Sequence, residues 1–262
     1  MDASDVALIL HIDGNEDNLN SRKNIARNMY ESEALRCVES WRHNAGWLSN
    51  CNIYALCCTD TPPTENTRWW LKEMGVTYVE SICPRLKEFS SGFLTIPYTG
   101  YFFTDIFRVP ERLVVRIDLD NKILKPFPME WFETAWSKWT VFCGQYSEVL
   151  EDRSAIKGDF PLDTSLIITR TDLPFYKHYY ENCFSEKYLN SEEWKRIKAV
   201  SGDYWLEEFV VDMMWKEGWN INPVKDYQYG PGYGSLEKFI KEGKTANLYM
   251  EHAHVRRQIE QN

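Results

Sequence analysis

Two aspartates one residue apart are the feature of this sequence best suited to chemistry. Asp118 and Asp120 follow a β-branched run that predicts a strand over residues 113–118. Side chains alternate faces along a strand, so residues two apart share a face and both carboxylates can meet one divalent cation. Hard oxygen ligands suit Mg2+ or Mn2+ better than zinc. A D-x-D also occurs at solvated strand ends that bind nothing, so its meaning depends on the elements around it.

The hydrophobic pattern places this motif in an α/β domain. Short apolar runs predict buried strands, and apolar residues at three- and four-residue intervals predict helices. The expected strands are 6–12, 52–59, 77–82, 113–118 and 165–169; the expected helices are 21–47, 64–74, 101–108, 129–142 and 204–216; segments 145–163 and 222–234 are expected to be loops. This alternation predicts a single mostly parallel central sheet flanked by helices, with ligands at the carboxyl ends of the strands.

The chain shows no linker that would divide it. We therefore expect one domain over residues 1–262, with a nucleotide-binding half at 1–121 and an acceptor-binding half at 122–262. A length of 262 residues is enough for one large hydrophobic core.

Composition excludes several classes of protein. The formal net charge of -9 argues against a nucleic-acid partner, because such proteins carry a basic surface. No apolar run approaches the roughly 20 residues that span a bilayer. The seven cysteines form no C-x-x-C pair, which predicts buried, reduced thiols rather than zinc ligands. The acidic N-terminus is unlike a signal peptide, so a cytoplasmic protein is expected.

The passage YFFTDIFRVPERLVVRIDLDNKILKPFP, residues 101–128, resembles the metal-binding segment of glycogenin-like and related nucleotide-sugar glycosyltransferases of the A-type fold. The resemblance implies Mn2+ or Mg2+ as cofactor, a nucleotide-sugar donor, most simply UDP-linked, and a glycan acceptor. It assigns Asp118 and Asp120 to the metal and the donor, and places Asp105 and Arg108 near the donor sugar.

A second acidic segment fits the same family plan. The resemblance places the catalytic carboxylate within residues 202–208, where Asp203, Glu207 and Glu208 are the candidates. On a helix Asp203 and Glu207 are four apart and share a face, whereas Glu208 points elsewhere. An acid at this position is also a common helix cap, so the choice among the three stays open. Asp163, in the segment that contacts sugar or acceptor in this family, is next in line.

Basic and imidazole side chains near the C-terminus complete the expected site. By the same resemblance a late histidine, His252 or His254, joins the metal shell, and Lys244 and Arg256 hold the donor diphosphate. The chain lacks the family's His-x-x-Gly-x-x-Lys pattern, and a solvated tail remains the alternative.

The first strands are expected to carry the nucleotide. His11 and Asp13 leave the first strand at its carboxyl end, and Asp60 leaves the second, where a carboxylate can accept the imide hydrogen of uracil. These acids would otherwise simply begin polar loops. Aromatic residues make up 15% of the chain, and five are candidates for stacking on sugar rings. They are Trp131, Trp136, Trp139, Trp205 and Tyr233.

Two other functions compete with glycosyl transfer. A degenerate transferase would bind glycans without catalysis, although the intact D-x-D argues against it. An aspartyl phosphatase also places D-x-D at a strand end, but at its first strand and with Thr or Val shortly after, whereas Asn121 and Lys122 follow here. With neither anchor nor glycosylation sequon, the chain looks more like a bacterial enzyme or the soluble glycosyltransferases of large algal viruses, which act in the host cytoplasm.

Overall fold

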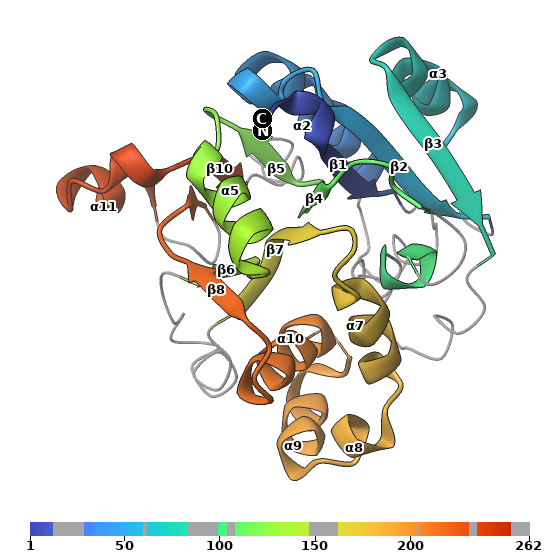
Figure 1. Cartoon of the computed structure of the whole chain (residues 1–262), viewed down its shortest axis with the longest axis vertical. Helices are drawn as coiled ribbons and strands as arrows, with labels where there is room; N and C mark the ends of the chain where they lie inside the picture. Colours follow the sequence, from blue (N-terminus) through green and yellow to red (C-terminus); the bar gives the residue numbers. More distant parts are fainter. Residues whose placement is uncertain are drawn as a thin grey trace.

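A seven-stranded sheet forms the centre of the protein (Figure 1). The computed structural model describes residues 1–12, 29–59, 62–82, 99–103, 108–146, 162–203, 205–230 and 235–252. The strand order is β3-β2-β1-β4-β7-β6-β8. The strands are β1 (Val6–His11), β2 (Asn52–Cys58), β3 (Val76–Ser81), β4 (Leu113–Ile117), β6 (Val141–Gln145), β7 (Leu162–Arg170) and β8 (Ile221–Val224).

Most of these strands are parallel. β2 pairs with β1 and β3, and β1 pairs with β4, all in parallel register. β6 and β8 are also parallel, whereas β7 runs antiparallel to both β4 and β6. The prediction of a mostly parallel central sheet is confirmed, and the carboxyl ends of β1, β2 and β4 meet at one edge.

A three-stranded sheet lies against that edge. It contains β5 (Asn121–Ile123), β10 (Met250–His252) and β9 (Gln228–Tyr229), in the order β5-β10-β9. β10 pairs antiparallel with β5, so that His252 lies opposite Asn121. The pairing brings the C-terminal segment beside the D-x-D turn.

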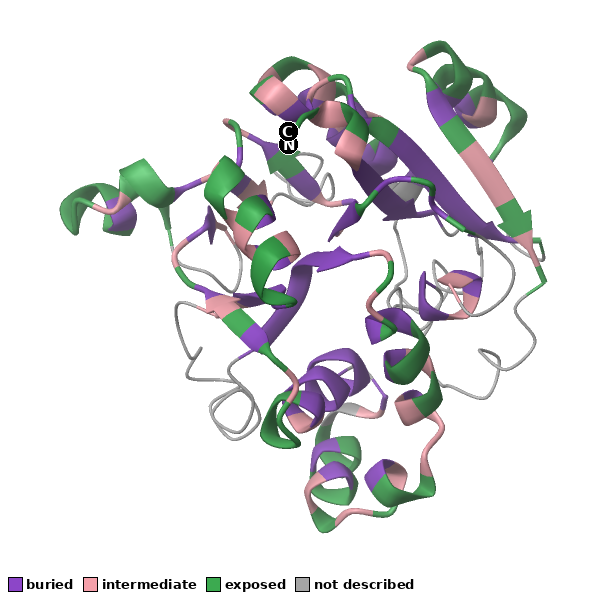
Figure 2. Ribbon diagram, viewed as in Figure 1, coloured by how far each residue is buried: buried purple, intermediate pink, exposed green. Residues whose placement is uncertain are grey.

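Helices cover both faces of the central sheet, and its inner strands are buried along most of their length, whereas the edge strand β3 is mostly half-buried or exposed (Figures 1 and 2). Along β1, Leu8 and Leu10 belong to one hydrophobic cluster, and Ala7 and Ile9 belong to the other. The alternation is that of a strand buried on both faces. One cluster includes residues of α2 (Met29–Asn44), α3 (Glu65–Glu73) and α5 (Met129–Lys138); the other includes residues of α7 (Phe175–Cys183), α8 (Glu186–Leu189), α9 (Glu192–Ser201) and α10 (Leu206–Lys216).

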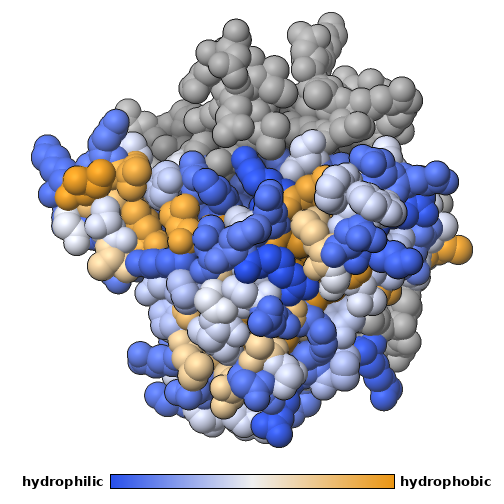
Figure 3. Space-filling view, turned by 90° about the horizontal axis from the view of Figure 1, so that it is seen from above, coloured by the Kyte–Doolittle hydropathy of each residue, from blue (hydrophilic) through white to orange (hydrophobic). Residues whose placement is uncertain are grey.

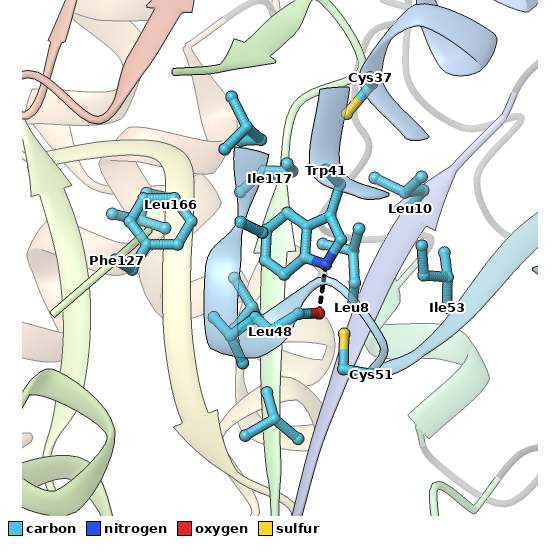
Figure 4. Packing of buried hydrophobic residues seen from close by; sticks show 14 of the residues in the cluster. Leu8, Leu10, Cys37, Trp41, Leu48, Cys51, Ile53, Ile117, Phe127 and Leu166 are labelled. Carbon is cyan, nitrogen blue, oxygen red and sulfur yellow. Dashed lines mark hydrogen bonds between the residues drawn. The ribbon is translucent and has the colours of Figure 1, made fainter. Parts of the chain in front are cut away.

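Trp41 of α2 fills the centre of the first cluster (Figure 4). Its indole nitrogen donates to the Leu48 carbonyl at 3.0 Å, so its one polar group is satisfied. Cys37 and Cys51 are buried nearby, and burial raises the pKa of the Cys51 thiol to about 11. The described cysteines are all buried and free of disulfides, as their spacing predicted.

Several predicted boundaries are wrong. The strand expected over 165–169 is longer, because β7 begins at Leu162 and ends at Arg170. The helix expected over 129–142 ends at Lys138, because Trp139 adopts a left-handed conformation with φ 50°. The segment expected to be a loop at 222–234 contains most of β8 and all of β9. Pro223 is tolerated in β8 because this strand is at the edge of the sheet, where one side needs no hydrogen bonds.

A short helix, α11 (Leu236–Lys241), lies at one end of the molecule (Figure 1). It leaves Leu236 and Ile240 40% and 60% exposed, and hydrophobic side chains gather at that end in Figure 3. The described residues also include three short 3-10 helices, Ala3–Asp5, Gly46–Leu48 and Thr245–Asn247, and a helical segment at residues 99–103. Among the helices of the described residues, none is long and apolar enough to cross a membrane.

Candidate active site

Arg116 and Asp118 form an ion pair at the end of β4. Arg116 Nη2 lies 2.6 Å from Asp118 Oδ1, and the guanidinium also donates to the Thr164 carbonyl of β7. The Arg116 side chain is 1% exposed and that of Asp118 is 32% exposed. Residues two apart on a strand share a face, so Arg116 lies on the same side of the sheet as Asp118. Although burial opposes its charge, Asp118 and Glu207 raise the pKa of Arg116.

A tight turn connects Asp118 to Asp120 and β5. The Asn121 amide donates to the Asp118 carbonyl at 3.2 Å, and the Asp118 amide donates to the Ser165 carbonyl at 3.3 Å. Arg36 of α2 donates to the Asp120 carbonyl at 3.2 Å. The D-x-D backbone is therefore fixed by contacts to β7 and to α2.

His252 joins the motif from the far end of the chain. Its Nε2 lies 3.0 Å from Asp120 Oδ2, and both side chains are about 15% exposed. The β5–β10 register produces this contact, because it places His252 opposite Asn121. Burial lowers the pKa of His252. The charges of Asp120 and then Asp118 raise it by more than burial lowers it, so the net shift of the pKa is upward.

The donor set is chemically suited to a divalent cation. Asp118, Asp120 and His252 bring oxygen and nitrogen ligands to one edge of the sheet, a set that Mn2+ accepts. Within the described part of the chain, no three His, Cys, Asp or Glu side chains are already grouped to hold a metal ion. Asp118 is instead paired with Arg116, and Asp120 with His252.

Glu207 and Glu208, in the first turn of α10, face Thr164 of β7. Thr164 Oγ1 lies 3.3 Å from Glu207 Oε2 and 3.5 Å from Glu208 Oε1, and the Tyr146 hydroxyl donates to Glu208 at 3.3 Å. Burial, then the charge of Glu207, raises the pKa of Glu208 well above its usual value. Asp163 and Asp118 add to this shift, so the acids of β4, β7 and α10 form one electrostatic group.

Two geometric predictions about these acids are wrong. Asp203 is outside α10, which begins at Leu206, and pairs with Lys198 of α9 at 2.7 Å. It therefore shares no helical face with Glu207. Glu208 does not point away: α10 is buried almost all round its first two turns, so helical phase does not separate an inner face from an outer one (Figure 2).

Asp163 is enclosed by donors. Its carboxylate accepts from the Ser165 amide at 3.0 Å, the Ser165 hydroxyl at 2.9 Å and Gln228 Nε2 at 3.2 Å, and from the Tyr227 hydroxyl. These contacts connect β7 to β9, and the Asp163 side chain is only 1% exposed. We interpret the Asp163 carboxylate as a structural residue that connects β7 to β9, rather than as a general acid or base.

Three further predicted residues, His11, Arg108 and Lys244, also lie in the described part of the chain. His11 ends β1 and is 3% exposed; burial, then the charge of Arg116, lowers its pKa to about 3, so its imidazole is neutral. Arg108 is exposed ahead of β4. Lys244 forms ion pairs with Glu242 at 2.9 Å and Asp226 at 3.5 Å.

The remaining predicted residues lie outside the described residues. They are Asp13, Asp60, Asp105, His254, Arg256 and, among the aromatic candidates, Tyr233.

Sequence reasoning missed Arg116 and Thr164 as members of the site. Arg116 had a readable signal, because it is the one charged residue in the otherwise apolar strand Leu113–Ile117 and lies two residues before Asp118. Thr164 was not singled out, although it lies in segment 162–165, which the resemblance placed at the sugar or acceptor; its contacts with Glu207 and Glu208 depend on α10 packing across β7.

Solved structures with the same fold are glycosyltransferases. Mouse xyloside xylosyltransferase 1, in its apo form, has 12% sequence identity and a TM-score of 0.52, covering 96% of this chain and 98% of that chain. A galactosyltransferase, LgtC, in complex with donor and acceptor sugar analogs has 10% identity and a TM-score of 0.60, over 94% of this chain and 86% of that chain. An active-site mutant of LgtC has 10% identity and a TM-score of 0.59 over the same shares.

The chain therefore has the A-type glycosyltransferase fold. No protein-family model matches its sequence, and no curated protein matches it at the sequence level.

Proposed function

We propose that this protein is a metal-dependent glycosyltransferase that moves a sugar from a nucleoside diphosphate donor, UDP-linked in the simplest case, to a glycan acceptor. One observation carries the proposal. Asp118 and Asp120 end a central strand of an A-type glycosyltransferase fold, and His252 contacts Asp120 from the C-terminal segment.

Asp118, Asp120 and His252 are the proposed metal ligands. A bound Mn2+ or Mg2+ would neutralise charge on the departing diphosphate. Arg116 offsets part of the negative charge of Asp118, which otherwise lies among Asp120, Asp163 and the acids of α10. This compensation lets the motif remain folded when no cation is bound.

Glu207 and Glu208 have different proposed roles. The raised pKa of Glu208 favours its protonated form, which can donate a hydrogen bond to a sugar hydroxyl. Glu207 is then the carboxylate that accepts a proton from the acceptor hydroxyl or orients it. Thr164 contacts both side chains and acts as a positioning residue.

A hydrolysis screen tests this function. Purified protein is incubated with a panel of UDP- and GDP-sugars, with Mn2+ or with EDTA, and released nucleotide is measured. We expect hydrolysis of at least one UDP-sugar with Mn2+ and none with EDTA. Binding of UDP without any turnover of any donor would instead indicate a degenerate, glycan-binding transferase.

A further inference from the structure

Two tryptophans and an arginine form a stacked cluster at the end of the central strands that is opposite the D-x-D motif. The Arg170 guanidinium carbon lies 3.8 Å from the ring centroid of Trp136 and 3.5 Å from that of Trp139. Two rings this close to one atom must lie on its two sides, so the guanidinium is between the indoles. Arg170 is 6% exposed, pairs with Asp172 and donates to the Trp136 carbonyl at 2.8 Å.

Trp139 is held in a strained conformation yet is half exposed. Its φ of 50° and ψ of 44° are left-handed, a conformation that is unfavourable for a bulky residue. Glycine is the usual residue at this position after a helix. Contact with the buried guanidinium of Arg170 favours this conformation and opposes the strain. The result is an indole that is 51% exposed and fixed in orientation.

The surroundings of Trp139 are polar. Lys138, Asp172 and Asn220 are exposed, and Asn220 Nδ2 donates to the Lys138 carbonyl at 3.0 Å. The exposed pair Trp69 and Trp70 differs, because their rings meet nearly edge-on at 73° and no described cation stacks on them.

A flat apolar ring with polar side chains around it matches the chemistry of a sugar. The C–H face of a pyranose packs on an indole, and its hydroxyls need hydrogen-bond partners at the rim. We infer that Trp139, held by Arg170 and Trp136, forms a saccharide-binding site separate from the proposed active site.

The two sites lie near opposite ends of the central strand β4. Arg170 is opposite Leu113 at the start of β4, whereas Asp118 follows the end of β4. At about 3.3 Å per residue along β4, the two sites are roughly 15 Å apart, so one monosaccharide cannot contact both sites. We therefore infer that the ligand is a polysaccharide chain. The choice of a polymer rests on the proposed function, whereas the saccharide-binding site at Trp139 is argued independently of it.

Native affinity electrophoresis tests this inference, in gels cast with dextran, xylan, β-1,3-glucan or galactan. We expect at least one polysaccharide to retard the wild-type chain, and Trp139→Gly, which suits the left-handed backbone, to remove the retardation. Trp139→Tyr keeps a flat ring and should still be retarded. Trp70→Ala is the matched control for loss of an exposed indole and should migrate as wild type.

Asp120→Ala separates the two proposals, because it should abolish donor hydrolysis and leave the retardation unchanged. Loss of retardation in Asp120→Ala would place the saccharide at the D-x-D edge and overturn the inference. So would equal retardation of wild type and Trp139→Gly, or no retardation in any of the four gels. A retarded wild type that hydrolyses no donor would refute the proposed function alone.

Discussion

Replacing Arg116 with methionine tests the electrostatic account of the site. The Arg116 side chain is 1% exposed and its partner Asp118 is 32% exposed. Removing one partner of a fully buried pair costs about 3–5 kcal/mol, and partial exposure of Asp118 reduces this to about 2–3 kcal/mol. In a domain of this size that loss corresponds to a fall in Tm of roughly 4–10 °C.

Urea unfolding with EDTA present measures this cost, and a double-mutant cycle with Asp118→Asn assigns it to the pair. Each single variant should lower the free energy of unfolding. The double variant should lose about 1.5 kcal/mol or more less than the sum of the two single losses, because neither charge then lacks its partner. Additive effects of Arg116→Met and Asp118→Asn, within about 0.5 kcal/mol, would refute the reasoning.

Other variants test single contacts of the site. Glu207→Gln should reduce turnover at least about a hundredfold with little change in donor affinity, the usual scale for loss of a general base; wild-type turnover would exclude Glu207 as the base. Since the folded-state pKa of Glu208 is raised, its protonated form stabilises the fold fully below its unfolded pKa, near 4.5, and this contribution is lost as pH rises towards the folded value. Glu208→Gln should therefore flatten the fall in Tm with rising pH, and an unchanged pH profile would contradict the shift. Asp120→Asn should lower the pKa of His252, followed by NMR titration of the imidazole in EDTA, because Asp120 is the charge that raises this pKa most; an unmoved pKa would mean that the contact does not form in solution.

The sequence predicted the parallel strands and the residues that follow their carboxyl ends. The alternating pattern around β1, β2 and β4 predicted the parallel half of the sheet, and the end of β4 predicted that Asp118 and Asp120 lie at its carboxyl edge. The resemblance predicted His252 or His254 near the motif, and His252 Nε2 lies 3.0 Å from Asp120 Oδ2; its role as a metal ligand stays a prediction.

Sequence reasoning failed where tertiary packing overrides local pattern. Glu207 and Glu208 are both buried because α10 packs between β7 and neighbouring helices, which no helical period reveals. β6 was missed because Trp139, rather than a glycine, ends α5 in a left-handed conformation. Arg116 was overlooked as a member of the site although its charge in an apolar strand was visible in the sequence; its contact with the Thr164 carbonyl depends on the pairing of β4 with β7.

The central claim is that Asp118, Asp120 and His252 bind a divalent cation that holds the donor diphosphate. Calorimetric titration of UDP into the protein, with Mn2+ and then with EDTA, tests it most directly. We predict that Mn2+ tightens UDP binding at least about tenfold in the wild type, which is about 1.4 kcal/mol, and leaves it unchanged in Asp120→Ala and His252→Ala. Equal UDP affinity of the wild type in Mn2+ and in EDTA would contradict the claim.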